Sequence, residues 1–142
     1  MSLHAKAYIA GIYEHPVRRA DTLSTAQLHA QVALGALQDA GLTLDDVDGY
    51  FCGADAPGLG GLTMAEYIGL NRLRHVDTTE SGGSAYLLHL SHAAQAIAAG
   101  HCNVALVTMA IKNMSCLKIH LRTQESTRVG TSGQSHLKQT TN

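Results

Sequence analysis

The sequence predicts an α/β fold, a layered arrangement built on a mostly parallel sheet. Segments with the pattern of strands alternate along the chain with segments that have the pattern of helices, as in right-handed βαβ units. Residues 102–109 form an uninterrupted apolar run, which is typical of a parallel strand covered on both faces. Residues 85–99 contain few polar side chains, so we expect a central helix that is buried nearly all round.

The first part of the chain predicts a strand followed by a helix. Residues 5–13 are rich in Ala, Ile and Tyr and alternate weakly, which favours a strand. Ser24 and Gln27 have the spacing of a capping box, in which each side chain bonds the main-chain N–H of the other residue. Gly41 is suited to the left-handed conformation that ends many helices. The pattern therefore predicts a helix over 24–40 with a small, apolar face that packs on a sheet.

The middle of the chain predicts a second βαβ unit. Residues 49–52 are apolar and bounded by turn formers, so they predict a strand. Residues 53–61 contain four glycines and a proline and predict a loop. The pattern then favours a helix over 62–70 and a strand over 74–79.

Charge and hydropathy divide the chain at about residue 110. Residues 1–110 carry five Lys/Arg and ten Asp/Glu, whereas residues 111–142 carry five Lys/Arg and one Glu. The second segment has nine Ser/Thr among its 32 residues and only eight apolar ones, none aromatic. We expect one domain over 1–110 and an atypical tail over 111–142 that is disordered or loosely packed. We interpret the tail as a truncated or altered reading of a longer gene.

Several classes of protein find no support in the sequence. The three cysteines have no pairing motif and no secretory pattern precedes them, so we expect a reducing, cytoplasmic setting. The apolar runs are shorter than the ~18 to 20 residues that a membrane span needs. The cationic tail lacks aromatic residues and a nucleic-acid motif, so no nucleic-acid partner is expected. Cys52 and Cys102 are interpreted as buried apolar side chains, with a reactive thiol as the alternative.

Residues 78–84, Thr-Thr-Glu-Ser-Gly-Gly-Ser, join the expected strand over 74–79 to the expected helix over 85–99. This helix ends in Ala-Ile-Ala-Ala-Gly at 96–100, and the apolar strand follows. A strand, a glycine elbow, a helix and a second strand in this order resemble the thiolase superfamily. In particular, residues 5–109 resemble the lipid-transfer or sterol-carrier-protein-x type of acetyl-CoA acetyltransferase. Those enzymes carry a nucleophilic cysteine at the elbow, where this chain has Gly83.

The resemblance implies carbon-carbon bond chemistry next to a thioester, with a coenzyme A thioester as substrate and no bound cofactor. Cysteine-less relatives of this kind act as aldolases or retro-aldolases on acyl-CoA compounds, often with a small OB-fold partner protein. The resemblance further implies a homodimer that forms through the strand before the elbow. Because the family's His and second Cys motifs lie in its second half, this chain is expected to be incomplete and inactive alone.

The elbow contains the candidate catalytic residues. Ser84 and Ser81 are possible substitutes for the missing nucleophile, although a hydroxyl needs an adjacent base. Ser84 is alternatively the cap of the following helix. Gly82 and Gly83 bring main-chain amides close to a substrate oxygen if they form an oxyanion site, and they form only a tight turn in the alternative interpretation.

Weaker patterns point to substrate phosphates or to metals. Arg18 and Arg19 are candidates for binding the phosphates of coenzyme A, with solvated loop charges as the alternative. His89 and His92 share a helix face, but no metal-ligand motif accompanies them, so no metal is expected. A non-catalytic thiolase-fold module for dimerisation or for partner or lipid binding is the second functional hypothesis. The third is a gene fragment without independent function.

Overall fold

The computed structural model describes residues 6–17, 19–53, 56–110 and 117–123. The elements, in chain order, are β1 (Ala7–Glu14), α1 (Thr25–Ala40), a 3₁₀ turn (Leu44–Asp46), β2 (Gly49–Cys52), α2 (Gly61–Ile68), β3 (His75–Asp77), α3 (Ala85–Ala98), β4 (Val104–Thr108) and β5 (Leu117–Thr123). Within these described ranges, no helix combines the length and the hydropathy that crossing a membrane requires.

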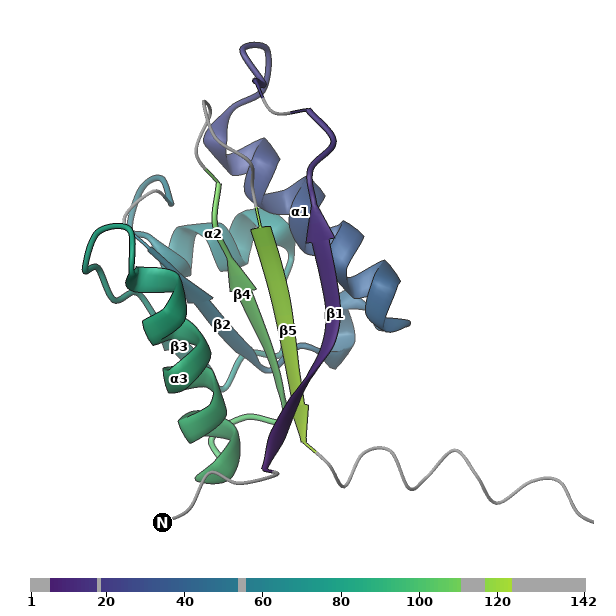
Figure 1. The fold of residues 1–142 in the computed structure, drawn as a ribbon, viewed down its shortest axis with the longest axis vertical. Coiled ribbons are helices and arrows are strands. Elements are labelled where there is room, and N and C mark those ends of the chain that lie inside the picture. The colour runs from purple at the N-terminus through teal and green to yellow at the C-terminus, as the bar shows by residue number, and fades with distance from the viewer. Residues whose placement is uncertain (1–5, 18, 54–55, 111–116, 124–142) are drawn as a thin grey trace, which may run out of the picture.

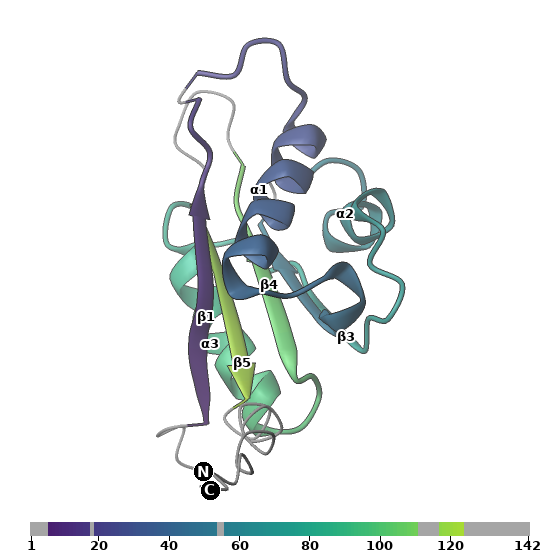
Figure 2. The ribbon, with the colours of Figure 1, turned by 90° about the vertical axis from the view of Figure 1, so that its right-hand side faces the viewer.

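The five strands form one mixed sheet with the order β1-β5-β4-β2-β3. β2 pairs in parallel with both β3 and β4, whereas β5 pairs antiparallel with both β1 and β4. Helices α1 and α2 cover one face of this sheet and α3 covers the other (Figures 1 and 2). The predicted α/β class is therefore confirmed, and the strands predicted at 49–52, 74–79 and 102–109 form its parallel part.

Helix α1 begins and ends as the sequence predicts. The Ser24 hydroxyl accepts the Gln27 N–H at 3.1 Å, and the Gln27 side-chain oxygen accepts the Ser24 N–H at 2.8 Å. Gly41 follows the helix with a φ of 66°. The helix lies close against β1, where a Cβ on Gly11 would stand 2.6 Å from the Ala36 carbonyl oxygen. Glycine in the strand therefore sets the distance between the two elements.

The two central strands are buried on both faces of the sheet, as the apolar run predicts. Every residue of β2 and of β4 is buried. On the face of α1 and α2, Tyr50 and Leu106 pack among the helix side chains, and on the α3 face Phe51 and Val107 pack against Ala93. The centre of the sheet thus separates two apolar layers, one under each group of helices.

Helix α3 is buried on one face only, which differs from the expectation of burial nearly all round. Its inner residues Ala85, His89, Ala93, Ala96 and Ile97 are buried against the sheet. Leu87 and Leu88 lie on the outer face, and Leu87 is 71% exposed. The reason is that a helix on one sheet buries a single stripe, and within the described residues no second layer covers the other side.

A strand occupies part of the segment for which the sequence predicts a disordered or loosely packed tail. β5 lies between β1 and β4 and pairs with each of them over its length, from Ala7↔Thr123 to Glu14↔Leu117 and from Val104↔Arg122 to Thr108↔Lys118. Leu121 is buried in the apolar layer under α3. Residues 117–123 are thus an integral strand, because their alternating sequence suits an antiparallel ladder. The rest of the tail lies outside the described residues, and the domain boundary stays a prediction.

Asp48 connects the beginnings of the three parallel strands. Its carboxylate accepts the main-chain N–H groups of Asn103 and Val104 at 2.7 and 2.8 Å. Its carbonyl oxygen accepts the N–H groups of Arg74 and His75 at 2.8 and 3.2 Å. Asp48, which immediately precedes β2, therefore holds the beginnings of both neighbouring strands, β3 and β4.

Candidate functional site

The connections of the parallel strands define the candidate place for a ligand. After β2 the chain goes to α2 on one face of the sheet, and after the neighbouring β3 it goes to α3 on the other face (Figure 2). In open α/β sheets, ligands bind at the carboxyl ends of strands where the connections diverge in this way. The elbow at residues 79–84, which joins β3 to α3, lies at this end of the sheet.

The start of α2 lies against the end of β3 because two glycines allow close approach. A Cβ on Gly60 would stand 2.7 Å from Thr78 Cγ2, and a Cβ on Gly61 would stand 2.7 Å from Val76 Cγ1. The Gly61 N–H donates to the Thr78 hydroxyl at 3.0 Å. These contacts fix the position of residue 78, immediately before the elbow.

The elbow turns through a left-handed glycine. Gly82 has a φ of 70°, which favours glycine, and its carbonyl oxygen accepts the N–H of Ala85 at 3.0 Å at the start of α3. The Gly82 N–H donates to the Glu80 carboxylate. The Glu80 carboxylate thus occupies the Gly82 N–H, which is one of the two amides that the sequence predicts for an oxyanion site. The oxyanion role stays a prediction.

Gly83 occupies an open position at the surface. No heavy atom lies within 4 Å of the place that a Cβ would take, and the residue is exposed. It directly precedes Ser84, from which α3 begins, so a side chain at position 83 would stand at the positive end of the helix dipole. The site therefore has room for a reacting group at the predicted nucleophile position, although the residue supplies none.

The two elbow serines contact one another. The Ser84 hydroxyl donates to the Ser81 carbonyl oxygen at 3.3 Å, and the two hydroxyl oxygens are 3.4 Å apart. Ser84 is the N-cap residue of α3, as predicted, but its hydroxyl accepts no N–H of the helix. None of these contacts brings a general base to either hydroxyl in the described part of the chain, and the catalytic role of the serines stays a prediction.

Two histidines of α3 hold the segment that leads into the elbow. His92 Nδ1 donates to Asp77 Oδ2 at 2.6 Å, and the Thr79 hydroxyl donates to Asp77 Oδ1 at 2.6 Å. His89 Nε2 donates to the Thr79 carbonyl oxygen at 2.9 Å. Residues 77–79 are therefore bonded to α3 at two points, His89 one turn after the start of the helix and His92 two turns after it.

The Asp77 carboxyl is held in its charged form by these contacts. Its partial burial is the largest single effect and raises the pKa, but the hydrogen bonds from Thr79 and His92, together with the nearby imidazoles, outweigh it. The pKa of Asp77 consequently lies below its ordinary value. His89, in contrast, is fully buried, and its Nδ1 has no hydrogen-bond partner among the described residues.

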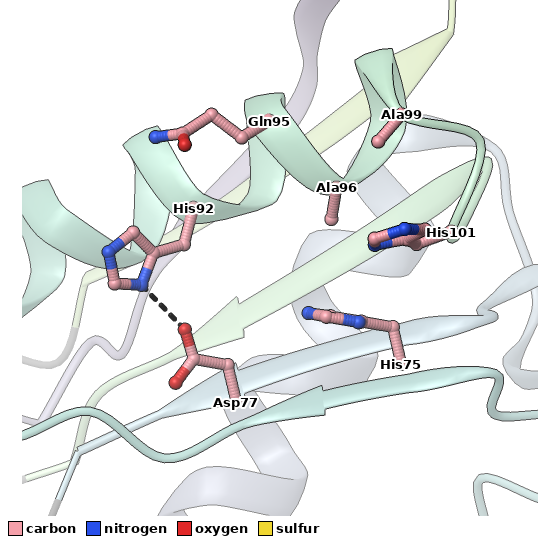
Figure 3. Close-up of a pocket in the computed structure, with 7 residues that line it drawn as sticks. All are labelled: His75, Asp77, His92, Gln95, Ala96, Ala99 and His101. Atoms are coloured by element: carbon pink, nitrogen blue, oxygen red, sulfur yellow. Dashed lines mark hydrogen bonds and ion pairs between the residues drawn. The ribbon is translucent and has the colours of Figure 1, made fainter.

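A groove of about 320 Å³ lies between β3 and the second half of α3 (Figure 3). Three imidazoles line it, from His75, His92 and His101, together with Asp77 and Gln95. The rings of His75 and His101 stack with their centroids 5.6 Å apart. The sequence did not predict this groove, because its histidines lie on three separate segments that only the fold brings together.

The predicted phosphate-binding arginines are only partly described. Arg18 lies outside the described residues. Arg19 forms an exposed ion pair with Asp21, with Nε 3.1 Å from Oδ2. Arg74 lies before β3 at the end opposite the elbow, with Nη1 3.8 Å from Asp48 Oδ2. Binding of phosphate by these side chains stays a prediction.

The two cysteines that the structure describes, Cys52 and Cys102, both lie inside the fold. Burial raises the pKa of the Cys102 thiol to about 12, and the nearby Asp48 carboxylate adds to this effect, so the interpretation as an apolar side chain is confirmed for Cys102. Across the described ranges, no three His, Cys, Asp or Glu residues are grouped as a metal ion would require.

Comparison with known proteins finds similarity in structure. No protein-family model matches the chain, and the search of curated proteins gave no match. Among solved structures, the Ltp2-ChsH2(DUF35) aldolase superposes with a TM-score of 0.71 and 29% identity over 78% of this chain. The 3-oxoacyl-(acyl carrier protein) synthase III FabH from Pseudomonas aeruginosa PAO1 gives 0.67 and 14% over 82%. Xanthomonas campestris OleA H285D gives 0.71 and 11% over 87%.

All three of these proteins are longer than this chain. The match spans 29% of the aldolase chain, 50% of the synthase chain and 57% of the OleA chain. At 14% and 11% identity, the synthase and OleA show a common fold with this chain and nothing further.

Proposed function

We propose that this chain, which has the thiolase fold, is part of an acyl-CoA enzyme of lipid metabolism. The enzyme breaks or makes a carbon-carbon bond next to a thioester, and this chain supplies its elbow. The observation that carries this proposal is the elbow itself. It combines an exposed left-handed glycine at the carboxyl end of β3 with the open position 83 at the start of a 14-residue helix. A negative charge that develops on a thioester oxygen would be stabilised there.

The absence of a nucleophile favours aldolase chemistry over acyl transfer. Acyl transfer through the enzyme needs a side chain that holds the acyl group, and position 83 is glycine. A retro-aldol cleavage needs no covalent intermediate. A base takes the proton of the β-hydroxyl group, the carbon-carbon bond breaks, and the electron pair passes to the enolate of the thioester, which is then protonated. The likeness to the Ltp2-ChsH2(DUF35) aldolase at 29% identity supports this choice.

The activity belongs to a chain longer than this one. The neighbours in structure extend well beyond the matched part, and the outer face of α3 is exposed here. We infer that the groups which complete the catalytic site lie in that additional length, as the family resemblance implies. A coenzyme A thioester is the substrate, and the chain described here is inactive alone.

We further propose two partners. The first is a second copy, because β3 lies at the edge of the sheet formed by the described residues and no described strand pairs with its outer side. The second is a small OB-fold protein, as the family resemblance implies, and the two-part name of the Ltp2-ChsH2(DUF35) aldolase supports a protein partner. A cytoplasmic location is consistent with the free cysteines Cys52 and Cys102.

A non-catalytic module for dimerisation, lipid transfer or partner binding is the second candidate. It is favoured by one observation, namely that the Glu80 carboxylate already occupies the Gly82 amide. On this alternative the elbow is a structural turn, and a longer chain that contains it binds no thioester there.

The decisive experiment measures cleavage of a β-hydroxyacyl-CoA by a longer chain that contains these residues. We expect release of a shorter acyl-CoA, and we expect Gly83→Leu to abolish it, because the added side chain fills the elbow without meeting any atom within 4 Å of its Cβ. Ser91→Leu, which introduces the same leucine side chain at an exposed position of α3, is the control and should leave turnover intact. Lack of turnover and of acyl-CoA binding in the longer chain would instead favour the non-catalytic module.

A further inference from the structure

We propose that Glu80 is the catalytic base of the carbon-carbon bond cleavage, and that its carboxylate takes the proton of the substrate's β-hydroxyl group at the elbow. This inference rests on the proposed function and deepens it, because it names the base that the retro-aldol step requires. Glu80 is the one acidic or basic side chain in the elbow at residues 79–84. The residue is exposed, so a substrate at the elbow can reach it.

The elbow holds the chain on both sides of Glu80. Before it, the Thr79 carbonyl oxygen accepts a hydrogen bond from His89 Nε2 at 2.9 Å, and the Thr79 hydroxyl donates to Asp77 Oδ1 at 2.6 Å. After it, the Gly82 N–H donates to the Glu80 carboxylate itself. A base that is oriented before the substrate arrives loses little conformational freedom in the reaction. These contacts therefore keep the carboxylate beside the Gly82 main chain, one residue before position 83.

The reach of this carboxylate matches the separation of two oxygens in the substrate. A hydrogen bond spans about 3 Å and consecutive Cα atoms are about 3.8 Å apart, so a carboxylate oxygen bound at Gly82 lies within roughly 7 Å of position 83. In a β-hydroxyacyl thioester, three carbons separate the hydroxyl oxygen from the carbonyl oxygen, a distance of about 3–5 Å. A thioester oxygen at the start of α3 thus brings the β-hydroxyl group within hydrogen-bond reach of Glu80. The open position 83 leaves room for the carbons between them.

The hydrogen bond from Gly82 does not prevent Glu80 from acting as a base. An ionised carboxylate has about four acceptor positions, and the Gly82 N–H takes one of them. The dipole of α3 also favours a negative charge at this end of the helix. The contact that favours a structural turn in the non-catalytic alternative is therefore equally suited to orienting a base.

The other titratable groups near the elbow are poorly placed to act as this base. His89 is fully buried, and its Nε2 already donates to a carbonyl oxygen of the main chain. His92 lies about 10 Å from the start of α3 at 1.5 Å per residue, and its Nδ1 bonds Asp77 (Figure 3). Asp77 accepts a hydrogen bond on each of its two oxygens. Among these groups, Glu80 alone combines exposure with a position inside the elbow.

The cleavage step balances without a further reactant. Glu80 takes the hydroxyl proton as the bond between the α and β carbons breaks, and the hydroxyl oxygen becomes the carbonyl oxygen of the departing aldehyde or ketone. The electron pair of the broken bond passes to the thioester, whose enolate oxygen lies at the start of α3. The protonated Glu80 then returns the proton to the α carbon, which gives the shorter acyl-CoA and restores the carboxylate. The additional length of the chain then serves to bind the substrate and exclude water.

The test compares Glu80→Gln with the wild type in a longer chain that contains these residues, with a β-hydroxyacyl-CoA as substrate. The glutamine oxygen still accepts the Gly82 N–H, so the elbow keeps its geometry. We expect kcat to fall at least about 100-fold with KM within about twofold, because general base catalysis contributes about 10²–10⁴ in rate. The acidic limb of the pH profile of kcat/KM should disappear as well. Glu66→Gln makes the same change at an exposed position of α2 and is the matched control.

The outcomes separate this inference from the proposed function on which it rests. A wild-type chain that cleaves the substrate, with Glu80→Gln equally active, would overturn the assignment of the base and leave the proposed function standing. A slower Glu80→Gln with an unchanged acidic limb would do the same, because another group would then be the base. A wild-type chain that does not cleave the substrate would overturn both. We expect the two glutamine variants to unfold at the same temperature by circular dichroism, so that lost turnover is not lost folding.

Discussion

Replacing the two elbow glycines one at a time should have opposite effects on stability. Both replacements with Ala reduce the entropy of the unfolded chain, which stabilises a protein by about 0.4–1 kcal/mol when the native conformation permits the new residue. Gly83 permits it, because no atom lies within 4 Å of the added Cβ and its backbone is not left-handed. Gly82 does not, because its φ of 70° costs an Ala about 1–2 kcal/mol. The entropy gain is common to the two variants, so their difference isolates that penalty.

Urea denaturation followed by circular dichroism measures this difference from the two midpoints at equal slope. We expect Gly83→Ala to be as stable as the wild type or slightly more so, and Gly82→Ala to be about 1–2 kcal/mol less stable than Gly83→Ala. Gly41→Ala is the control, because Gly41 has a φ of 66° and equally open surroundings at the end of α1. Equal stability of the two elbow variants, together with a destabilised Gly41→Ala, would refute the left-handed geometry assigned to Gly82.

Three other predictions follow from buried or charged groups. Asp77→Asn should be least stable relative to the wild type near pH 7. The deficit should shrink below about pH 4, because a carboxyl with a lowered pKa stabilises the fold above its ordinary pKa and loses this contribution as pH falls through the folded value. Cys102 should resist alkylation in the folded chain at pH 8 and react after denaturation, since its pKa is about 12; labelling at equal rates in both states would contradict this. Thr108→Val should lower the free energy of unfolding by about 2–4 kcal/mol, because the buried Thr108 hydroxyl contacts His29 Nδ1 at 2.9 Å and the Tyr50 hydroxyl at 2.6 Å. Thr108→Ser should recover most of that loss.

The sequence predicted those helices and strands whose limits depend on residues close together in the chain. The capping box at Ser24 and Gln27 and the glycine at position 41 placed α1 to within a residue at its start, since a helix end is decided by neighbours in sequence. The apolar run at 102–109 located β4 because a strand covered on both faces needs no polar side chain.

Longer-range features were missed for physical reasons that differ from case to case. The alternation in Leu117–Thr123 is a strand signal, but it lies in a segment whose overall composition is polar, and composition outweighed it. The burial of α3 was overestimated because its leucines are apolar on both sides, and sequence does not tell which side meets the sheet. The network of Asp77, Thr79 and His92 depends on how α3 returns along β3, which spacing alone does not determine.

Asp48 lies at the end of the parallel strands opposite the elbow, and this separation has a consequence for engineering the chain. Its carboxylate and carbonyl oxygens align the beginnings of the strands without any contribution from residues 79–84. Alignment of the parallel strands at this end of the sheet therefore depends little on which residues form the elbow. Residues 80–84 can be treated as an exchangeable cassette, into which a cysteine, a longer loop or a reporter group could be grafted while the scaffold beneath still folds.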